Sequence, residues 1–212
     1  MTVKRSYEDS CGIARALDVV GERWALLVVR ELLLGPKRFT DLRAGLARIG
    51  PDMLAARLRE LEDAGVVVQR RLAPPAARTV YELTARGREL EPVLHALGRW
   101  GSRQALRPEP PPLSPDAAVV AMQTMFEPDP DARLGVIALR LDGREFSLRA
   151  DADQLVATTG SGAAPAATVQ TDPVTLSAVL WHGLDIDQAI ADGRLTIDGD
   201  PRAARSLLNR YG

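Results

Sequence analysis

Arginines are the residues of this 212-residue chain whose type and spacing suggest chemistry, because they gather in its first half. Residues 1–107 hold 19 Lys and Arg against 13 Asp and Glu, whereas residues 108–212 hold 8 against 15. A guanidinium group offers forked donors that match phosphate oxygens and guanine edges. The first half is therefore expected to bind a polyanion, and the acidic second half to meet a different partner.

Other reactive residue types are too few and too scattered to predict catalysis. The chain has two histidines, His95 and His182, and a single cysteine, Cys11. Their spacing fits neither a zinc site nor a Ser/His/Asp relay. We therefore expect no enzyme activity, no metal site and no cofactor. A single cysteine cannot form an intramolecular disulfide, and no apolar run approaches a membrane span, so a cytoplasmic protein is expected.

Helical periodicity and stop signals divide the first half into short helices. Apolar residues recur at helical spacing over residues 11–20 and again over 22–34, where Gly35-Pro36 ends the second helix. Thr40 is the expected N-cap of a third helix, in which Leu42 and Leu46 share a face. The three-residue loop RIG then leads into the next helix.

The stretch PDMLAARLRELEDAGVV, residues 51–67, predicts a helix that follows Gly50 and ends at Gly65. Leu54, Leu58 and Leu61 recur at i, i+4 and i+7, so they are expected to face a core and to leave the opposite side free for a groove. The segments VVVQRRL and TVYELT follow as two strands of a basic hairpin. This order predicts a winged helix-turn-helix, whose second helix enters the major groove of DNA.

The segment from CGIARALDVVGERWALLVVRELLLG through RFTDLR and MLAARLRELE to HALGRWG closely resembles the HxlR-type winged-helix transcription regulators of bacteria. The resemblance covers residues 11–101. It implies a dimeric repressor or activator with a recognition helix at 51–64 and a wing at 66–83. The chain has Gly50 where family members often have a serine cap, a change that costs only a few tenths of a kcal/mol.

Three groups of side chains are expected at the DNA. Arginines of the recognition helix are expected at base edges or phosphates, residues at the start of the preceding helix at phosphates, and wing arginines along the minor groove. The full set is Arg38, Thr40, Arg43, Asp52, Met53, Ala56, Arg57, Arg59, Arg70, Arg71 and Arg78.

A homodimer is expected because two-fold readers place two recognition helices on a near-palindromic site. The helix RELEPVLHALGRWG carries a wide apolar face, part of which is expected to join the first helix of the partner. The expected interface residues are Ile13, Leu17, Leu94, Leu97 and Trp100. Because some regulators of this type sense oxidants through an N-terminal cysteine, redox sensing by Cys11 is a second hypothesis; an inert cysteine is the simpler one.

The second half follows the proline-rich stretch PEPPPLSP, residues 108–115, which is expected to be a linker between domains 1–107 and 116–212. A helix at 115–126 precedes two strands around Asp142-Gly143, a strong hairpin signal. Further strands, two helices, a strand at 194–200 and a closing helix predict an α+β domain. The fold class expected for the chain is therefore α+β, with two domains.

The run TDPVTLSAVLWHGLDIDQAIADGRLTIDGDPRAARSLL resembles sterol-carrier-protein-like domains, and REFSLRADADQLVATTG fits their preceding hairpin. The resemblance implies an apolar tunnel for a hydrophobic small molecule. Adaptable Met and large apolar groups suit such a lining, although the same residues can simply fill a core. The residues expected to line it are Met122, Met125, Phe126, Phe146, Leu176, Val179, Leu180, Trp181, His182, Ile186 and Ile190.

These observations predict a dimeric transcription regulator that binds double-stranded DNA, is controlled by a hydrophobic effector, and has no membrane partner. Two alternatives stay open. The second half could be a carrier of lipid-like molecules tethered to DNA, or it could serve only for dimerisation or protein docking. An effector can regulate only if it prefers one arrangement of the protein over another.

Overall fold

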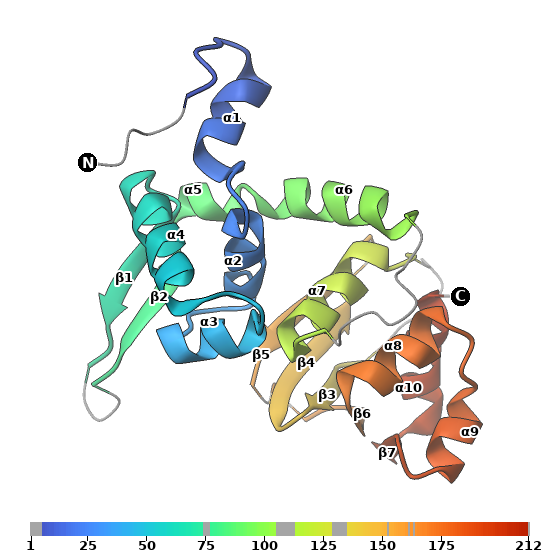
Figure 1. Ribbon diagram of the computed structural model, residues 1–212. Coiled ribbons are helices and arrows are strands. Elements are labelled where there is room, and N and C mark those ends of the chain that lie inside the picture. The colour runs from blue at the N-terminus through green and yellow to red at the C-terminus, as the bar shows by residue number, and fades with distance from the viewer. Residues whose placement is uncertain are drawn as a thin grey trace. The chain divides into compact units, whose positions relative to one another are not determined.

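The computed structural model describes residues 6–73, 77–104, 113–128, 135–151, 153–160, 162 and 164–211. It divides into two compact units, Met1–Leu94 and His95–Gly212, and mixes helices with two sheets, which confirms the α+β class (Figure 1). The division falls within helix α6 (Glu91–Ser102), before the predicted domain end at residue 107. Most of the predicted linker, residues 108–112, lies outside the described residues.

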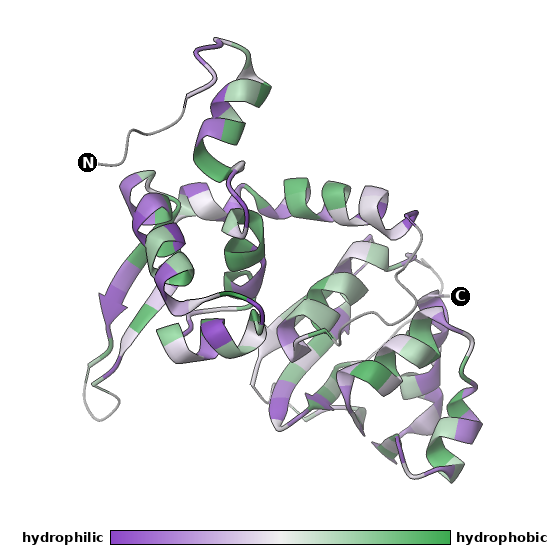
Figure 2. Cartoon of the chain, viewed as in Figure 1, coloured by the Kyte–Doolittle hydropathy of each residue, from purple (hydrophilic) through white to green (hydrophobic). Residues whose placement is uncertain are grey.

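The first unit contains the predicted helices in order: α1 (Gly12–Val20), α2 (Ala25–Leu32), α3 (Phe39–Gly45) and α4 (Pro51–Asp63). Its core is built from α2, α3, α4 and the strands that follow, and Val28, Leu42 and Leu54 are all fully buried. Figure 2 shows the corresponding pattern: α2 is hydrophobic over most of its length, whereas α4 alternates between hydrophobic and hydrophilic faces. The helix-turn-helix pair is therefore anchored on α2.

The start of α3 differs from the prediction that Thr40 caps it. The helix begins one residue earlier, at Phe39, and its N-cap is Arg38. The Asp41 carboxylate accepts the Arg38 backbone N–H at 3.3 Å and two bonds from the Arg38 guanidinium, each 2.8 Å long. Because a carboxylate can satisfy the free N–H groups at a helix start, Asp41 replaces the hydroxyl that we expected to do so.

Helix α4 follows the predicted boundaries closely. Gly50 is its N-cap, Pro51 occupies the first position, and Leu54, Leu58 and Leu61 are buried as predicted, with exposures of 0–1%. The helix ends where Gly65 adopts a φ of +68°, a left-handed conformation that glycine accepts without strain. The N–H of Val66 donates to Leu61 O at 2.9 Å, so the chain turns directly into the wing.

The wing is an antiparallel pair of strands, β1 (Val67–Arg71) and β2 (Thr79–Leu83), as predicted. Residues 74–76 at its tip lie outside the described residues. Its base is packed, because Val67, Val80 and Leu83 are buried, whereas Gln69 to Arg71 of β1 are exposed. After the wing comes a short helix that was not predicted, α5 (Ala85–Arg88), in which Thr84 is the cap and accepts the Gly87 N–H at 3.1 Å. The helix predicted over residues 88–101 is present as α6, which begins three residues later, at Glu91.

The second unit is a five-stranded sheet with helices, as predicted. Its sheet has the order β5-β4-β3-β6-β7, in which β3 and β6 run parallel and the other neighbours antiparallel. Asp142 and Gly143 both have positive φ at the β3–β4 turn, in agreement with the hairpin prediction. Its elements are α7 (Pro115–Met125), β3 (Ile137–Leu141), β4 (Arg144–Ala150), β5 (Leu155–Thr159), β6 (Ala167–Thr171), α8 (Pro173–Trp181), α9 (Ile186–Ala191), β7 (Thr196–Gly199) and α10 (Pro201–Leu208), with a short 3-10 turn (Asn209–Tyr211) at the end.

The core of the second unit lies between one face of this sheet and its helices. Helix α7 contacts β5 and α8, and α10 contacts β6 and β7 (Figure 1). Leu139 of β3 and Val169 of β6 are buried, while the next residues, Arg140 and Gln170, are exposed. The period of two in a strand explains this alternation. In the part of the chain that the structure describes, no helix has the length and apolar character that crossing a membrane requires.

Candidate nucleic-acid interface

The face of α4 that points away from the core carries the tip residues expected at DNA. Asp52 and Arg59 are exposed, Met53 is 45% exposed, and Ala56 is partly exposed. Arg59 makes no hydrogen bond or ion pair with any other described residue. This face is therefore free to enter a groove, with Arg59 as its unengaged cation.

Arg57 lies elsewhere than we expected. It is 8% exposed, forms an ion pair with Glu60 one turn along α4, and lies 3.8 Å from Glu22. The reason is its position between Leu54 and Leu58 on the edge of the packed stripe, where a long side chain lies along apolar neighbours and reaches solvent with its head. The expectation that Arg57 projects freely into a groove does not match this placement.

Helix α3 presents one engaged and one unengaged cation. Arg38 is held by Asp41, and the hydrogen bond from the Arg38 guanidinium keeps the pKa of the Asp41 carboxyl below its usual range. Thr40 is exposed, and its hydroxyl lies 3.4 Å from Asp41. Arg43 is exposed and has no partner among the described side chains. Sequence reasoning missed Arg48, an exposed residue of the loop before α4, although its place in that loop was a usable signal.

The wing shows the same division. Arg70 forms an ion pair with Glu82 on the neighbouring strand, with an N···O distance of 2.9 Å. Arg71 and Arg78 are exposed and their guanidinium groups contact none of the described acidic residues. The register that sets Val68 opposite Glu82 brings Arg70 within reach of that carboxylate. Thus, among the residues that the structure describes, Arg43, Arg59, Arg71 and Arg78 are the sequence-predicted arginines without an ion pair or hydrogen bond.

Apolar side chains are exposed on α1 and α6. On α1, Ile13 is 72% and Leu17 41% exposed, and on α6 Leu97 is 46% and Trp100 62% exposed. Leu94 instead packs against the core of the first unit. Solvent-facing apolar groups at helical spacing are typical of a surface covered by a partner. We call Ile13, Leu17, Leu97 and Trp100 the α1/α6 apolar residues.

Cys11 is exposed at the N-cap of α1, and its backbone N–H donates to Asp9 at 2.8 Å. Its side chain is thus accessible to reagents, and redox sensing stays a prediction. In the described ranges, no group of three or more His, Cys, Asp or Glu side chains, with either histidine or without, is arranged so that it could hold a metal ion. His95 Nδ1 lies 2.8 Å from the hydroxyl of Thr124, which itself donates to Val120 O. His95 Nδ1 is therefore the donor in this bond.

The side chains expected to line a ligand tunnel lie mostly inside the second unit. Met122, Phe146 and Leu176 are fully buried, and Leu180 and Ile186 are nearly so. Met125, Phe126, Val179, Trp181 and Ile190 are partly buried, and His182 is exposed. This burial agrees equally with a packed core and with a lining, so the ligand assignment stays a prediction.

Tyr211 is the residue that sequence reasoning missed in this region. Its ring meets the rings of Phe126 and Trp181 edge to face, with centroids 6.3 and 6.2 Å apart. Burial raises the pKa of the Tyr211 hydroxyl, so the group stays protonated. Tyr211 is four residues beyond Leu207, but only the folded chain brings its ring to Phe126 of the distant helix α7.

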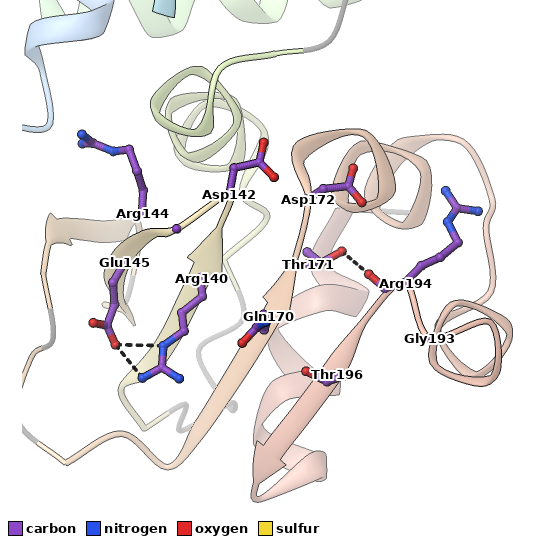
Figure 3. A pocket seen from close by; sticks show the side chains of 11 residues that line it. Arg140, Asp142, Arg144, Glu145, Gln170, Thr171, Asp172, Gly193, Arg194 and Thr196 are labelled. Carbon is purple, nitrogen blue, oxygen red and sulfur yellow. Dashed lines mark hydrogen bonds and ion pairs between the residues drawn. The ribbon is translucent and has the colours of Figure 1, made fainter. Parts of the chain in front are cut away.

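A polar hollow of about 500 Å³ lies at one end of the sheet in the second unit (Figure 3). Side chains from the β3–β4 hairpin, from β6 and from the segment before β7 surround it. Arg140 forms an ion pair with Glu145, and the Thr171 hydroxyl donates to Arg194 O at 2.8 Å. None of the residues expected to bind a hydrophobic ligand lines this hollow.

Comparison with known proteins accounts for both halves of the chain. The model of the HxlR-like helix-turn-helix family matches residues 19–109, and that of the SCP-2 sterol transfer family matches residues 131–209. Over 88 residues the chain is 35% identical to the uncharacterized HTH-type transcriptional regulator YvaP of Bacillus subtilis, and this match covers 42% of the chain and 82% of YvaP. The chain belongs to the HxlR-like helix-turn-helix family.

Further members of this family match the same half. The uncharacterized HTH-type transcriptional regulator Rv3095 of Mycobacterium tuberculosis is 39% identical over 101 residues, which are 48% of this chain and 63% of Rv3095, less than two thirds of that relative. The HTH-type transcriptional regulator YodB of B. subtilis is 33% identical over 88 residues, covering 42% of this chain and 79% of YodB. The solved reduced form of YodB matches with a TM-score of 0.41 and 31% identity, over 45% of this chain and 94% of that chain.

Proposed function

We propose that this protein is a DNA-binding transcription regulator whose α4 helix reads the major groove. The observation that carries the proposal is the set of four arginines, Arg43, Arg59, Arg71 and Arg78, that the fold leaves exposed and unengaged on α3, α4 and the wing. Guanidinium groups at such positions suit phosphates and guanine edges. Relatives named as HTH-type transcriptional regulators support the same role.

Within this interface the side chains divide by task. Arg59, with Asp52, Met53 and Ala56 beside it, is proposed to meet base edges. Phosphate contacts are assigned to the other exposed groups, which fix the register of the protein on the duplex. These are Arg38, Thr40 and Arg43 on α3 and Arg70, Arg71 and Arg78 on the wing. Arg57, a buried residue of α4 that is paired with Glu60, is proposed to support the helix.

The functional protein is proposed to be a homodimer on a near-palindromic site. Domain 1–107 would supply both DNA binding and dimerisation. The α1/α6 apolar residues would form the interface, and Leu94, which packs on its own core, would border it with the part of its side chain that stays exposed. Two recognition helices about 34 Å apart can enter the major groove at two points one helical turn apart, on the same side of the duplex. The exposure of Trp100, 62%, supports this assignment, because so large an apolar side chain is rarely left in water without a partner.

The second half, residues 116–212, is proposed to hold an apolar effector that alters DNA affinity. Its match to the SCP-2 sterol transfer family and the apolar residues between its sheet and helices support this assignment. Native mass spectrometry of the gently purified protein against a panel of hydrophobic metabolites tests it. A bound species that also changes DNA affinity is expected. A bound species without that change would favour a tethered carrier, and no bound species a docking module.

Selection of DNA fragments from a random library by the full-length protein tests the central proposal. The selected fragment and a scrambled fragment of equal length are then titrated by fluorescence anisotropy at several salt concentrations. We expect tighter binding to the selected fragment, by about 10³-fold or more, and affinity that falls steeply with salt. Equal affinities for the two fragments would refute sequence recognition.

A further inference from the structure

A buried charged cluster joins three parts of the first unit. Glu31, near the end of α2, is 0% exposed, and Lys37, in the loop between α2 and α3, is 5% exposed. The Lys37 ammonium donates to Glu31 Oε2 at 2.6 Å, and the Arg30 guanidinium donates to Glu31 Oε1 at 2.9 Å. Removing charges from water is costly, and apolar residues of similar volume are often as stable at such a place. The stability of the core alone therefore does not account for the cluster.

The cluster also fixes the end of α3. A Cβ atom built on Gly45, the last residue of α3, would overlap Glu31 Oε2. The backbone conformation does not explain the glycine at this position, because the φ of Gly45 is not positive and other residues could adopt it. Its lack of a side chain is what lets the α3 backbone approach the carboxylate closely. The Glu31 carboxylate of α2 therefore lies in close contact with the end of α3, the first helix of the helix-turn-helix pair.

The backbone of Lys37 fixes the wing at the same point. Its N–H donates to Tyr81 O at 3.0 Å, and the Tyr81 N–H donates to Lys37 O at 2.7 Å, which adds a short bridge to strand β2. Arg38, the next residue, caps α3. One residue thus connects the α2 carboxylate, the start of α3 and the wing strand. The relative position of α3 and the wing depends on where Lys37 is held.

We infer that Glu31, Lys37 and Gly45 form a positioning joint that holds the wing and the α3–α4 pair in the spacing required for sequence-specific DNA recognition. The inference rests on the proposed function. None of the three is offered as a DNA contact, since Glu31 and Lys37 are buried. They act through Arg59 on α4 and through the wing arginines, whose separation the joint sets. Residues that act this way should affect discrimination between DNA sequences more than folding.

The test compares Glu31→Gln, Lys37→Met and the double variant Glu31→Gln/Lys37→Met in the full-length protein. Each single variant removes one member of the buried Glu31–Lys37 pair and leaves the charge of the other, so a lowered melting temperature is expected. The double variant removes both charges of this pair and leaves the charge of Arg30, which is 23% exposed, so its melting temperature should return to that of the unchanged protein or exceed it. Its preference for the selected over the scrambled fragment should nevertheless fall by roughly tenfold or more, because small misplacements of contacting groups have large effects.

A matched control is the surface ion pair of the second unit, Arg140→Met/Glu145→Gln, whose side chains are 49% and 30% exposed and which should change neither the melting temperature nor the preference by much. A double variant that recovers its melting temperature and keeps its preference would overturn the inference. So would a double variant that stays destabilised or fails to fold, because the pair would then be holding the fold rather than the spacing. The same titration is run on the unchanged protein. If the unchanged protein binds the selected and the scrambled fragment equally, that result refutes the proposed function rather than the positioning role of the joint.

Discussion

Arg57 and Arg59 lie two residues apart on α4, and replacing each by alanine should separate helix support from base reading. Arg59 is exposed and unengaged among the described residues, so Arg59→Ala should change the free energy of unfolding by less than about 0.5 kcal/mol. On the selected fragment it should cost about 1–3 kcal/mol, roughly 5- to 150-fold in Kd, if its fork meets a base edge. On the scrambled fragment the loss should be much smaller.

Arg57→Ala should have the opposite profile. Arg57 is 8% exposed, and alanine keeps its Cβ, so two methylene groups are lost, which at about 0.8 kcal/mol each give an upper value of about 1.6 kcal/mol for lost burial. Glu60 is 52% exposed, so its carboxylate stays hydrated when its partner is removed, and loss of that pair adds less than about 1 kcal/mol. We expect a loss of about 1.5–2.5 kcal/mol in the free energy of unfolding.

Urea denaturation followed by circular dichroism measures the stability of both variants, and anisotropy titration on the two fragments measures their DNA affinity. For Arg57→Ala, the ratio of the two affinities should stay unchanged well below its melting temperature. Equal losses for Arg59→Ala on both fragments would make Arg59 a phosphate contact. A changed ratio with intact stability for Arg57→Ala would contradict the supporting role assigned to that residue.

Three further predictions concern the fold and the interface. Gly87→Ala should lower the melting temperature, because a Cβ there would overlap Val66 O, and overpacking costs about 1–3 kcal/mol or more; Gly101→Ala, where the space is open, is the matched control, and equal melting temperatures would refute the argument. Trp100→Ala should shift the sedimentation of the protein from dimer toward monomer at micromolar concentration, because it removes a large apolar side chain of the proposed interface. An unchanged dimer would show that Trp100 has no part in that interface. Asp41→Asn should destabilise the protein at pH 7 but progressively less below about pH 4. The pKa of the Asp41 carboxyl is lower in the folded than in the unfolded protein, so its charge stabilises the fold at pH values above the unfolded-state pKa, and this stabilisation is lost as the pH falls. Denaturation curves at pH 7 and pH 3 that show the same difference between Asp41→Asn and the unchanged protein would contradict the role of the charge.

Local sequence signals were sufficient to predict most of the elements. The three leucines of α4 at i, i+4 and i+7, the proline after Gly50 and the Asp142-Gly143 turn each depend on interactions within a few residues. The cap of α3 was mispredicted because we assigned it to the hydroxyl of Thr40, whereas the helix begins at Phe39 and the Asp41 carboxylate accepts the backbone N–H of Arg38. Residue preferences favoured a hydroxyl as the cap and did not predict that Arg38 would occupy this position.

The engagement of side chains could not be predicted in the same way. Arg57 and Arg59 have the same residue type and lie on one helix, yet packing buries one of them and leaves the other exposed. The bridge between Lys37 and Tyr81 joins residues far apart in the chain, and no spacing rule announces it. Tyr211 reaches Phe126 only after the sheet and its helices assemble. Sequence therefore predicted an arginine-rich interface, whereas the fold determined which of these arginines have no partner among the described residues.

Hydroxyl-radical footprinting of the full-length protein on its selected DNA fragment tests the central claim most directly. If two copies of α4 read one site from one side of the duplex, two protected segments should be centred about 10 base pairs apart, or a multiple of that spacing, with symmetry between the strands. Arg59→Ala should weaken both segments together. A single protected segment, or protection spread evenly along the fragment, would contradict a two-fold reader that recognises its sequence through α4.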